Sequence, residues 1–153
     1  MITLSEVIRA ADDDEWTLAE GSIDDRPSMV RFRPALAPVM GHEELPRRLV
    51  VTWDFGDDGE SGMPDGEIAE DLELFENALN DALDPDRVAV LAFVFTHMGV
   101  REWHYYFANI KLVTGRINDA LAEQPDLPIE IRAFDDPEWT ELAAVLNSVS
   151  DEN

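Results

Sequence analysis

The feature that most constrains the fold is the segment "RVAVLAFVF" at residues 87–95, in which an uninterrupted apolar run follows the arginine. A strand with one face in water alternates apolar and polar residues, whereas a run without alternation indicates a strand that is covered on both faces. The chain must therefore fold around this strand with a layer of structure on each side. Its length of 153 residues is that of one ordinary domain, so we expect a single domain over residues 1–153.

The next segment, "THMGVREWHYYFAN" at residues 96–109, predicts that this strand turns back on itself. Residues 98–99 are Met-Gly, and a glycine-containing pair between two β-rich runs is typical of a hairpin turn. A two-residue turn at this place puts Phe93 opposite His104 and Phe95 opposite Glu102 on the returning strand. The segment is expected to be a hairpin rich in aromatic side chains.

Two helices and two more strands flank this hairpin. Strands are predicted over 47–55 ("RRLVVTWDF") and 128–134 ("PIEIRAF") from their β-forming residues. A helix is predicted where apolar residues recur at helical spacing, at Ile68, Leu72, Phe75, Leu79 and Ala82. A second helix should begin after Asn109 as its cap and turn inward Ile110, Val113, Ile117 and Leu121.

Residues 47–134 therefore spell β-α-β-β-α-β, which is the order of the ferredoxin-like split βαβ sandwich. We predict an α+β fold in which a mostly antiparallel sheet carries the two helices on one face. Residues 1–46 form an N-terminal extension, with a short helix that starts at a capping box (Thr3 and Glu6) and strands at 16–20 and 28–33. Residues 135–149 form a C-terminal helix that Asp136 caps, with Pro137 in its first turn.

The charge of the chain excludes several classes of partner. It has 34 acidic and 11 basic residues, a formal net charge of −23. Such a surface repels phosphate backbones and anionic lipid, so we expect no direct nucleic-acid binding and no membrane binding. A basic protein partner is electrostatically favoured, although plain solubility or adaptation to high salt explains the same charge. No oligomeric state follows from the sequence.

The cysteine content, the N-terminal sequence and the length of the apolar runs predict the cellular compartment. The chain has no cysteine, which excludes disulfides, thiolate nucleophiles and cysteine-bound metal, and which fits a reducing environment. The N-terminus lacks the basic and apolar regions of a secretion signal, and no run approaches the length of a membrane span. We expect a cytoplasmic protein.

The hairpin contains a candidate functional cluster. Glu102, His104 and Tyr106 share one face of the returning strand and could act as an acid–base cluster, to which Arg101 is added although alternation puts it on the other face. The alternative is that strands simply prefer aromatic side chains and that this histidine packs within the sheet. The packing interpretation is favoured because no nucleophile can be identified nearby, and we assign no catalytic residue.

Other polar groups predict neither a metal nor a cofactor. His97 and His104 with His42 are the only imidazoles available for zinc. The loop from Asp54 to Asp65 resembles a calcium loop at its glycine but has the wrong residues at its third and last ligand positions. The arginines are better explained by internal ion pairs than by an anion clamp, at Arg31, Arg33, Arg47 and Arg48. Phosphate-loop, dinucleotide and hydrolase-elbow motifs are missing from the sequence.

Three short motifs occur in an order that resembles a known family. They are "GMP" at 62–64 before an acidic helix, "GVREWHYYFAN" at 99–109 and "FDDPEW" at 134–139. Together they resemble the bacterial domain-of-unknown-function family numbered 695, over about residues 15–146. The resemblance implies a small intracellular domain without an established activity. Its analogy to regulators of ribonuclease E activity, which are small acidic proteins that bind that enzyme, implies a regulatory role and supplies no catalytic residues.

These observations lead to one main expectation and two alternatives. We expect a non-catalytic, acidic intracellular binding or regulatory domain that modulates a basic or RNA-processing protein. The first alternative is a small hydrolase or ligand-processing enzyme with a site on the 96–109 hairpin. The second is a structural domain that associates with itself through an uncovered strand edge.

Overall fold

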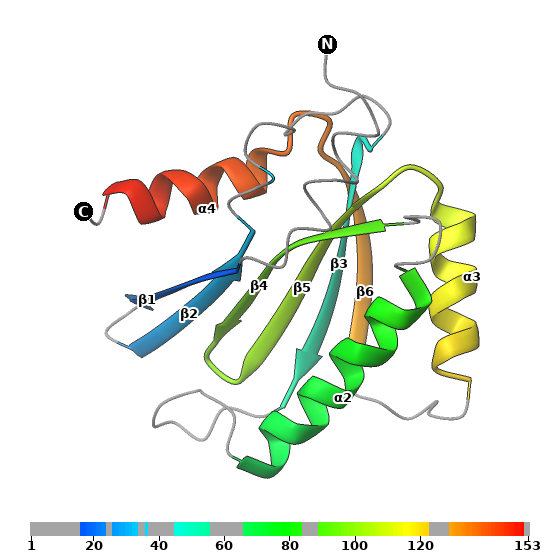
Figure 1. The fold of residues 1–153 in the computed structure, drawn as a ribbon, viewed down its shortest axis with the longest axis horizontal. Coiled ribbons are helices and arrows are strands. Elements are labelled where there is room, and N and C mark those ends of the chain that lie inside the picture. Colours follow the sequence, from blue (N-terminus) through cyan, green and yellow to red (C-terminus); the bar gives the residue numbers. More distant parts are fainter. Residues whose placement is uncertain are drawn as a thin grey trace.

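The computed structural model describes residues 16–23, 26–33, 36, 45–55, 66–83, 89–122 and 129–151 (Figure 1). This part of the chain is a mixed α+β structure with one six-stranded sheet and three helices. The strands are β1 (Thr17–Ile23), β2 (Arg26–Phe32), β3 (Arg47–Asp54), β4 (Ala89–His97), β5 (Val100–Phe107) and β6 (Ile129–Asp135). The helices are α2 (Gly66–Leu83), α3 (Ile110–Ala120) and α4 (Thr140–Asp151).

The strands lie in the order β1-β2-β4-β5-β3-β6, and every neighbouring pair is antiparallel. This confirms the α+β class and the mostly antiparallel sheet. The two N-terminal strands, whose place in the sheet the sequence left open, extend it beyond β4, and β1 and β6 form its two edges (Figure 1). The predicted helix near Thr3 lies outside the described residues.

The β4–β5 hairpin has the register that its turn predicts. Phe93 pairs with His104 and Phe95 pairs with Glu102 across the two strands. A register shift interrupts the pairing between Leu91 and Phe93, so Ala92 and Phe93 both pack on the same side of the sheet. From Ala89 to Val94 every residue of β4 is buried, which confirms that the central apolar run is covered on both faces.

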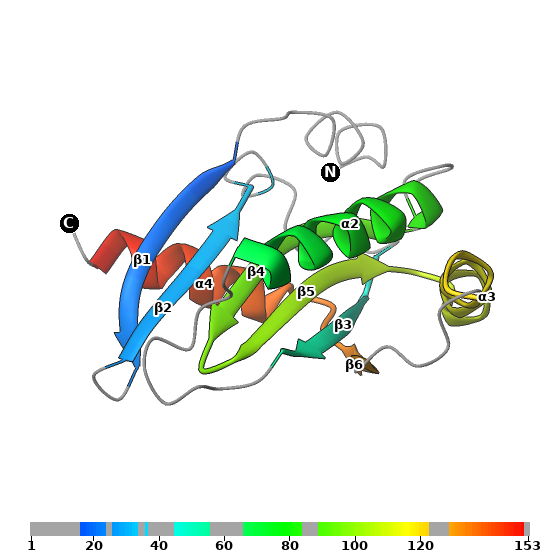
Figure 2. The same ribbon diagram turned by 90° about the horizontal axis from the view of Figure 1, so that it is seen from below.

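Two hydrophobic cores lie on opposite faces of the sheet, one under α2 and α3 and one under α4 (Figure 2). The residues of β5 alternate between them, because Trp103, Tyr105 and Phe107 join the first core and Tyr106 joins the second. The first core also contains the buried residues of the two helices: Leu72, Phe75, Leu79, Leu83, Val113 and Ile117. Both predicted helical patterns are thereby confirmed.

The ends of α2 and α3 are stabilised by specific contacts. The side chain of Asn109 caps α3 by accepting a hydrogen bond of 3.2 Å from the amide of Leu112, as predicted. Arg116 of α3 donates to the carbonyl of Ala82 (3.4 Å), near the C-terminal end of α2 where carbonyl groups lack helical partners. None of the described helices is long and apolar enough to cross a membrane.

The C-terminal helix begins later than the sequence predicts. Asp136 does cap it, but Pro137 lies in a turn before α4, and the helix begins at Thr140. The prediction that Pro137 occupies the first helical turn is therefore wrong. Trp139 causes the delay, because it has a left-handed backbone (φ 56°) and its indole is fully buried, with its N–H donating to the carbonyl of Leu45 (2.9 Å).

The hairpin turn yields a test of the fold. Met98 has φ 45° and Gly99 has φ 80°, the two positive values that a type I′ turn requires. Methionine is strained in this region, whereas asparagine tolerates it. We expect Met98→Asn to raise the free energy of unfolding by about 0.5–1 kcal/mol and Met98→Val to lower it by about 1–2 kcal/mol. Urea unfolding would measure both, and a less stable asparagine variant would contradict this account of the turn.

Candidate functional site

The structure separates the four residues of the predicted hairpin cluster. Glu102, His104 and Tyr106 lie on the α4 side of the sheet, whereas Arg101 faces a cavity on the α2 side. Inclusion of Arg101 in one cluster with the other three is therefore wrong, because successive residues of a strand point to opposite faces. The remaining three do share a face, but they divide between two sets of contacts.

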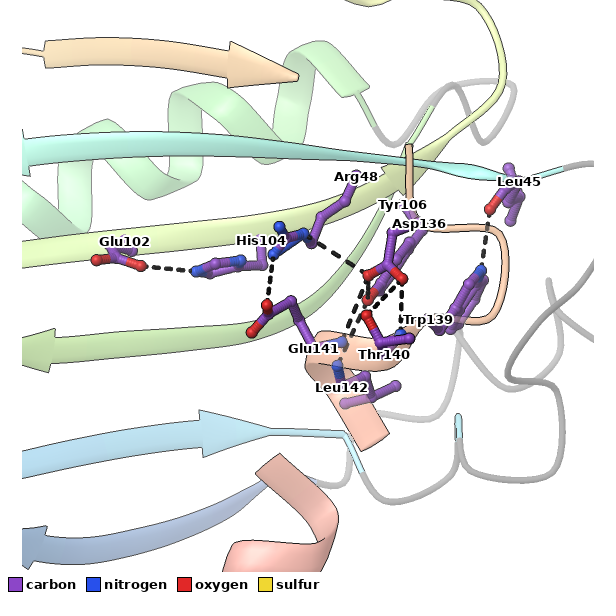
Figure 3. Close-up of polar contacts among 10 residues, drawn as sticks. All are labelled: Leu45, Arg48, Glu102, His104, Tyr106, Asp136, Trp139, Thr140, Glu141 and Leu142. Carbon is purple, nitrogen blue, oxygen red and sulfur yellow. Dashed lines mark hydrogen bonds and ion pairs between the residues drawn. The ribbon is translucent and has the colours of Figure 1, made fainter. Parts of the chain in front are cut away.

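The first set is centred on the carboxylate of Asp136, which is 4% exposed (Figure 3). Its Oδ2 accepts a hydrogen bond of 2.8 Å from the hydroxyl of Tyr106. Its Oδ1 accepts from the amide (2.7 Å) and the hydroxyl (2.8 Å) of Thr140, the first residue of α4. The ring of Tyr106 also stacks on Trp139, with centroids 4.2 Å apart and planes 3° from parallel. These contacts join β5 to the start of α4.

Electrostatics keep this carboxylate ionised. Burial would raise the pKa of Asp136, but the hydrogen bonds from Thr140, Tyr106 and Glu141 outweigh it and hold the pKa below its usual value. Burial raises the pKa of Tyr106, and the neighbouring carboxylate raises it further, so its hydroxyl remains a donor. The guanidinium of Arg48 lies 3.8 Å from both Asp136 and Glu141, and compensates the buried negative charge.

The second set pairs Glu102 with His104. The Nε2 atom of His104 lies 2.9 Å from Oε1 of Glu102, and the imidazole stacks on Phe93 with centroids 4.1 Å apart. His97 approaches the other oxygen of the same carboxylate at 3.6 Å. The predicted proximity of Glu102 and His104 is thereby confirmed (Figure 3).

Burial decides the protonation of this pair. His104 is 6% exposed, and burial lowers its pKa below the usual 6.5 despite the opposing effect of Glu102. The hydrogen bond from His104 lowers the pKa of Glu102, against the effect of burial. At neutral pH the imidazole is therefore neutral and donates its Nε2 hydrogen to an ionised Glu102.

A cavity of about 260 Å³ lies beside the pair. It is lined by Arg48, Val50, Thr52, Glu102, His104, Arg132, Phe134 and Glu141. For His104 to act as a base there, one ring nitrogen would have to accept a proton from a bound molecule. Nε2 is held by Glu102, and Nδ1 is buried without a partner in the described part of the chain. This arrangement suits a packing role better than proton transfer.

The metal hypotheses have little support in the described residues. Among these residues, no three histidine or carboxylate side chains are arranged to hold a metal ion. His42 and residues 56–65 of the acidic loop lie outside the described part, so the structure does not test the calcium-loop alternative.

Most of the predicted arginine ion pairs are present. Arg31 pairs with Glu76, Arg47 lies 3.3 Å from Asp135, and Arg48 approaches Asp136. The contact between Tyr106 and Asp136 was not expected from the sequence. The one available signal was that each lies in one of the recurrent motifs, at 99–109 and 134–139.

The Tyr106–Asp136 contact can be tested by removing one hydroxyl. We expect Tyr106→Phe to lower the free energy of unfolding by about 1.5–3 kcal/mol, because a buried carboxylate loses a donor. Tyr105→Phe is the matched control, since that hydroxyl donates to the neutral Asn80 (2.8 Å) in a less buried place. Its expected cost is about 0.5–1.5 kcal/mol. Equal losses in urea unfolding would contradict the central role of Asp136.

The buried imidazole predicts a dependence of stability on pH. Because the folded-state pKa of His104 is lowered, the unfolded chain binds this proton more readily. The contribution of His104 to the free energy of unfolding should therefore be fully present above about pH 6.5. It should decrease as the pH falls below this value, until the folded-state pKa is reached. The contribution of Glu102 is lost only at lower pH, as the pH falls through its own lowered pKa.

The variant His104→Gln separates this effect from other titrations. Glutamine can still donate to Glu102 but does not titrate. We expect the variant to lose part of the change in unfolding free energy between about pH 7.5 and 5.5, and NMR of the wild type to give a His104 pKa below 6.5. An unchanged pH profile in the variant would show that His104 is not the responsible group.

Comparison with known proteins agrees with the family resemblance that the short motifs indicate. No curated protein matches the chain. The model of a family of unknown function, DUF695, matches residues 14–143, which include the hairpin and the segment that contains Asp136 and Trp139. Because this match spans most of the sequence, the chain belongs to the family of unknown function DUF695.

Proposed function

We propose that this chain is a non-catalytic binding domain that recognises a basic protein in the cytoplasm, such as an RNA-processing protein, through the outer surface of α2. The observation that carries the proposal is the composition of that surface. Over its 18 residues α2 has six acidic residues and no basic one. We define the acidic face of α2 as its exposed residues Glu67, Glu70, Asp71, Leu74 and Asp81.

An apolar side chain lies within this acidic face. Leu74 is 68% exposed and is the most exposed of the large hydrophobic residues in the described part of the chain. Interfaces commonly place an apolar contact inside a polar rim, where charges set the orientation and the rate of association. A basic partner with an apolar residue among its positive charges would complement both features.

Part of the acidic face is unfavourable for the helix itself, although the helix dipole favours Glu67 in the first turn. Like charges three or four residues apart, as at Glu67, Glu70 and Asp71, destabilise a helix by about 0.2–0.5 kcal/mol per pair. Asp81 lies near the C-terminal end of α2, where negative charge opposes the helix dipole. Solubility alone does not require acids to be gathered on one helix, so their concentration favours recognition of a partner.

We also propose a more specific description of the fold. The order β4-β5-β3-β6 with two crossover helices, α2 and α3, supports a ferredoxin-like split βαβ core over residues 47–134. The alternative function, a small hydrolase or ligand-processing enzyme on the hairpin, has less support. The nitrogens of His104 are occupied or buried, as described above.

Capture experiments with matched variants test the proposal. The immobilised chain would be mixed with lysate of its own cells at low salt, and retained proteins identified by mass spectrometry. We expect a basic protein whose retention falls about tenfold, or about 1.4 kcal/mol, in a triple variant of the acidic face. That variant combines Glu67→Gln, Glu70→Gln and Asp71→Asn.

The control carries the same change in charge elsewhere. Glu20→Gln, Asp119→Asn and Glu138→Gln alter exposed acids outside α2 and should leave retention nearly unchanged. Leu74→Ser, which keeps every charge, should weaken retention as well. Equal losses in both triple variants would mean that only the overall field attracts the protein, and would refute a binding surface on α2.

A further inference from the structure

On the α2 side of the sheet lies a second cavity, of about 350 Å³, that the proposed function does not use. Its floor consists of residues of β2, β4 and β5, which neighbour one another in the sheet: Met29, Arg31, Val94, Thr96 and Arg101. Its wall consists of residues of α2, namely Ala69, Glu73, Glu76 and Asn77, and Leu18 of β1 lies at its rim. We propose that this cavity binds a small organic monocarboxylate with an apolar tail, whose carboxylate is held by Arg101 and Arg31.

The arginines in this cavity have an incomplete set of partners. Arg31 and the indole N–H of Trp103 both donate to the same oxygen of Glu76. Arg101 donates through Nε to the hydroxyl of Thr96 (2.8 Å), and in the described part of the chain no contact engages its two terminal amino groups. Glu76 thus pairs with Arg31, whereas the hydrogen-bond partner of Arg101 is the neutral Thr96.

The guanidinium of Arg101 therefore favours an added hydrogen-bond acceptor. Arg101 is half-buried, and burial lowers its pKa, an effect that Glu76 opposes and Arg31 increases. A buried cation beside another cation is stabilised by an anion that accepts its remaining hydrogens. Two arginines and two glutamates line the cavity, so its formal charge is balanced, and the groups left for a ligand are the terminal amino groups of Arg101, which no described residue contacts.

The lining indicates the class of anion. A planar carboxylate matches the two parallel N–H groups of a guanidinium. Glu73 and Glu76 already balance the two arginines of the cavity, so it accommodates one added negative charge better than the two of a phosphate dianion. Leu18, Met29 and Val94 supply apolar surface, and Leu18 is 57% exposed, so that a bound alkyl tail would cover it.

NMR titration with matched probes tests the proposal. The probes are 4-methylpentanoate, its neutral amide 4-methylpentanamide and inorganic phosphate, each added at millimolar concentration in physiological salt to screen the long-range field. We expect the acid to shift the backbone amides of Thr96 and Arg101 and the indole N–H of Trp103. The amide and phosphate should leave these signals nearly unchanged.

Two variants assign the binding to the arginines. Arg101→Gln and Arg31→Gln should each weaken binding of 4-methylpentanoate about tenfold. Arg132→Gln removes the same charge from an exposed arginine that lines the other cavity, and should bind as the wild type does. Well-dispersed spectra of either cavity variant show that it is folded, so one folded variant is sufficient.

Four results would overturn the proposal. They are no response to the acid, an equal response to the neutral amide, a stronger response to phosphate, or an equal loss of binding in Arg132→Gln. No response to the acid would show that the cavity does not bind it. An equal response to the neutral amide would show an apolar cavity that does not recognise anions. The third assigns a different ligand class, and the fourth leaves only a nonspecific effect of charge. None of these outcomes depends on a protein partner, so the proposal stands or falls separately from the acidic face of α2.

Discussion

The carboxylate of Asp136 is the contact on which the arrangement of α4 depends. It accepts hydrogen bonds from Tyr106 in the middle of the sequence and from Thr140 at the start of the helix, and it lies beside Arg48 of β3. Arg48, Tyr106 and Asp136 are far apart in the chain, so a single buried charge joins the end of β6 to β3, to β5 and to the start of α4 (Figure 3). With α4 held, Trp139 and Leu142 can close the second core. A buried charge has this effect only when its hydrogen bonds are complete, because an unpaired carboxylate would cost several kcal/mol.

The two faces of the sheet use their polar residues differently. On the α4 side, Asp136, Tyr106 and the Glu102–His104 pair bind one another, so these groups serve mainly to stabilise the fold. On the α2 side, Glu76 is shared by Arg31 and Trp103, while Arg101 keeps donors without a partner in the described residues. The outer surface of α2 adds acids that weaken the helix. Polar groups that stabilisation does not account for are better candidates for recognition, and in this chain they gather around α2.

Much of the fold could be predicted from the sequence because it depends on local patterns. The Met-Gly turn set the register of Phe93 with His104, and the helical spacing from Ile68 to Ala82 identified α2. The start of α4 was predicted incorrectly, because the docking of Trp139 on Leu45 overrides the helix-starting preference of Pro137. The separation of Arg101 from His104 follows from strand alternation alone. The cavity beside Arg101 could not be predicted, since its lining comes from β1, β2, α2, β4 and β5, and only the tertiary structure brings these elements together.

Two of the short motifs of this chain, at 99–109 and 134–139, lie where the elements of the fold meet. Tyr106 belongs to the first of these two, Asp136 and Trp139 belong to the other, and all three lie in mutual contact. Their presence is explained by packing and hydrogen bonding, and it requires no shared chemistry. These three residues therefore account for the architecture of the chain, and recognition of a partner or ligand is to be sought in residues outside these contacts. The acidic face of α2 lies outside these contacts, and so do Arg31 and Arg101 of the neighbouring cavity, although Arg101 belongs to the hairpin motif.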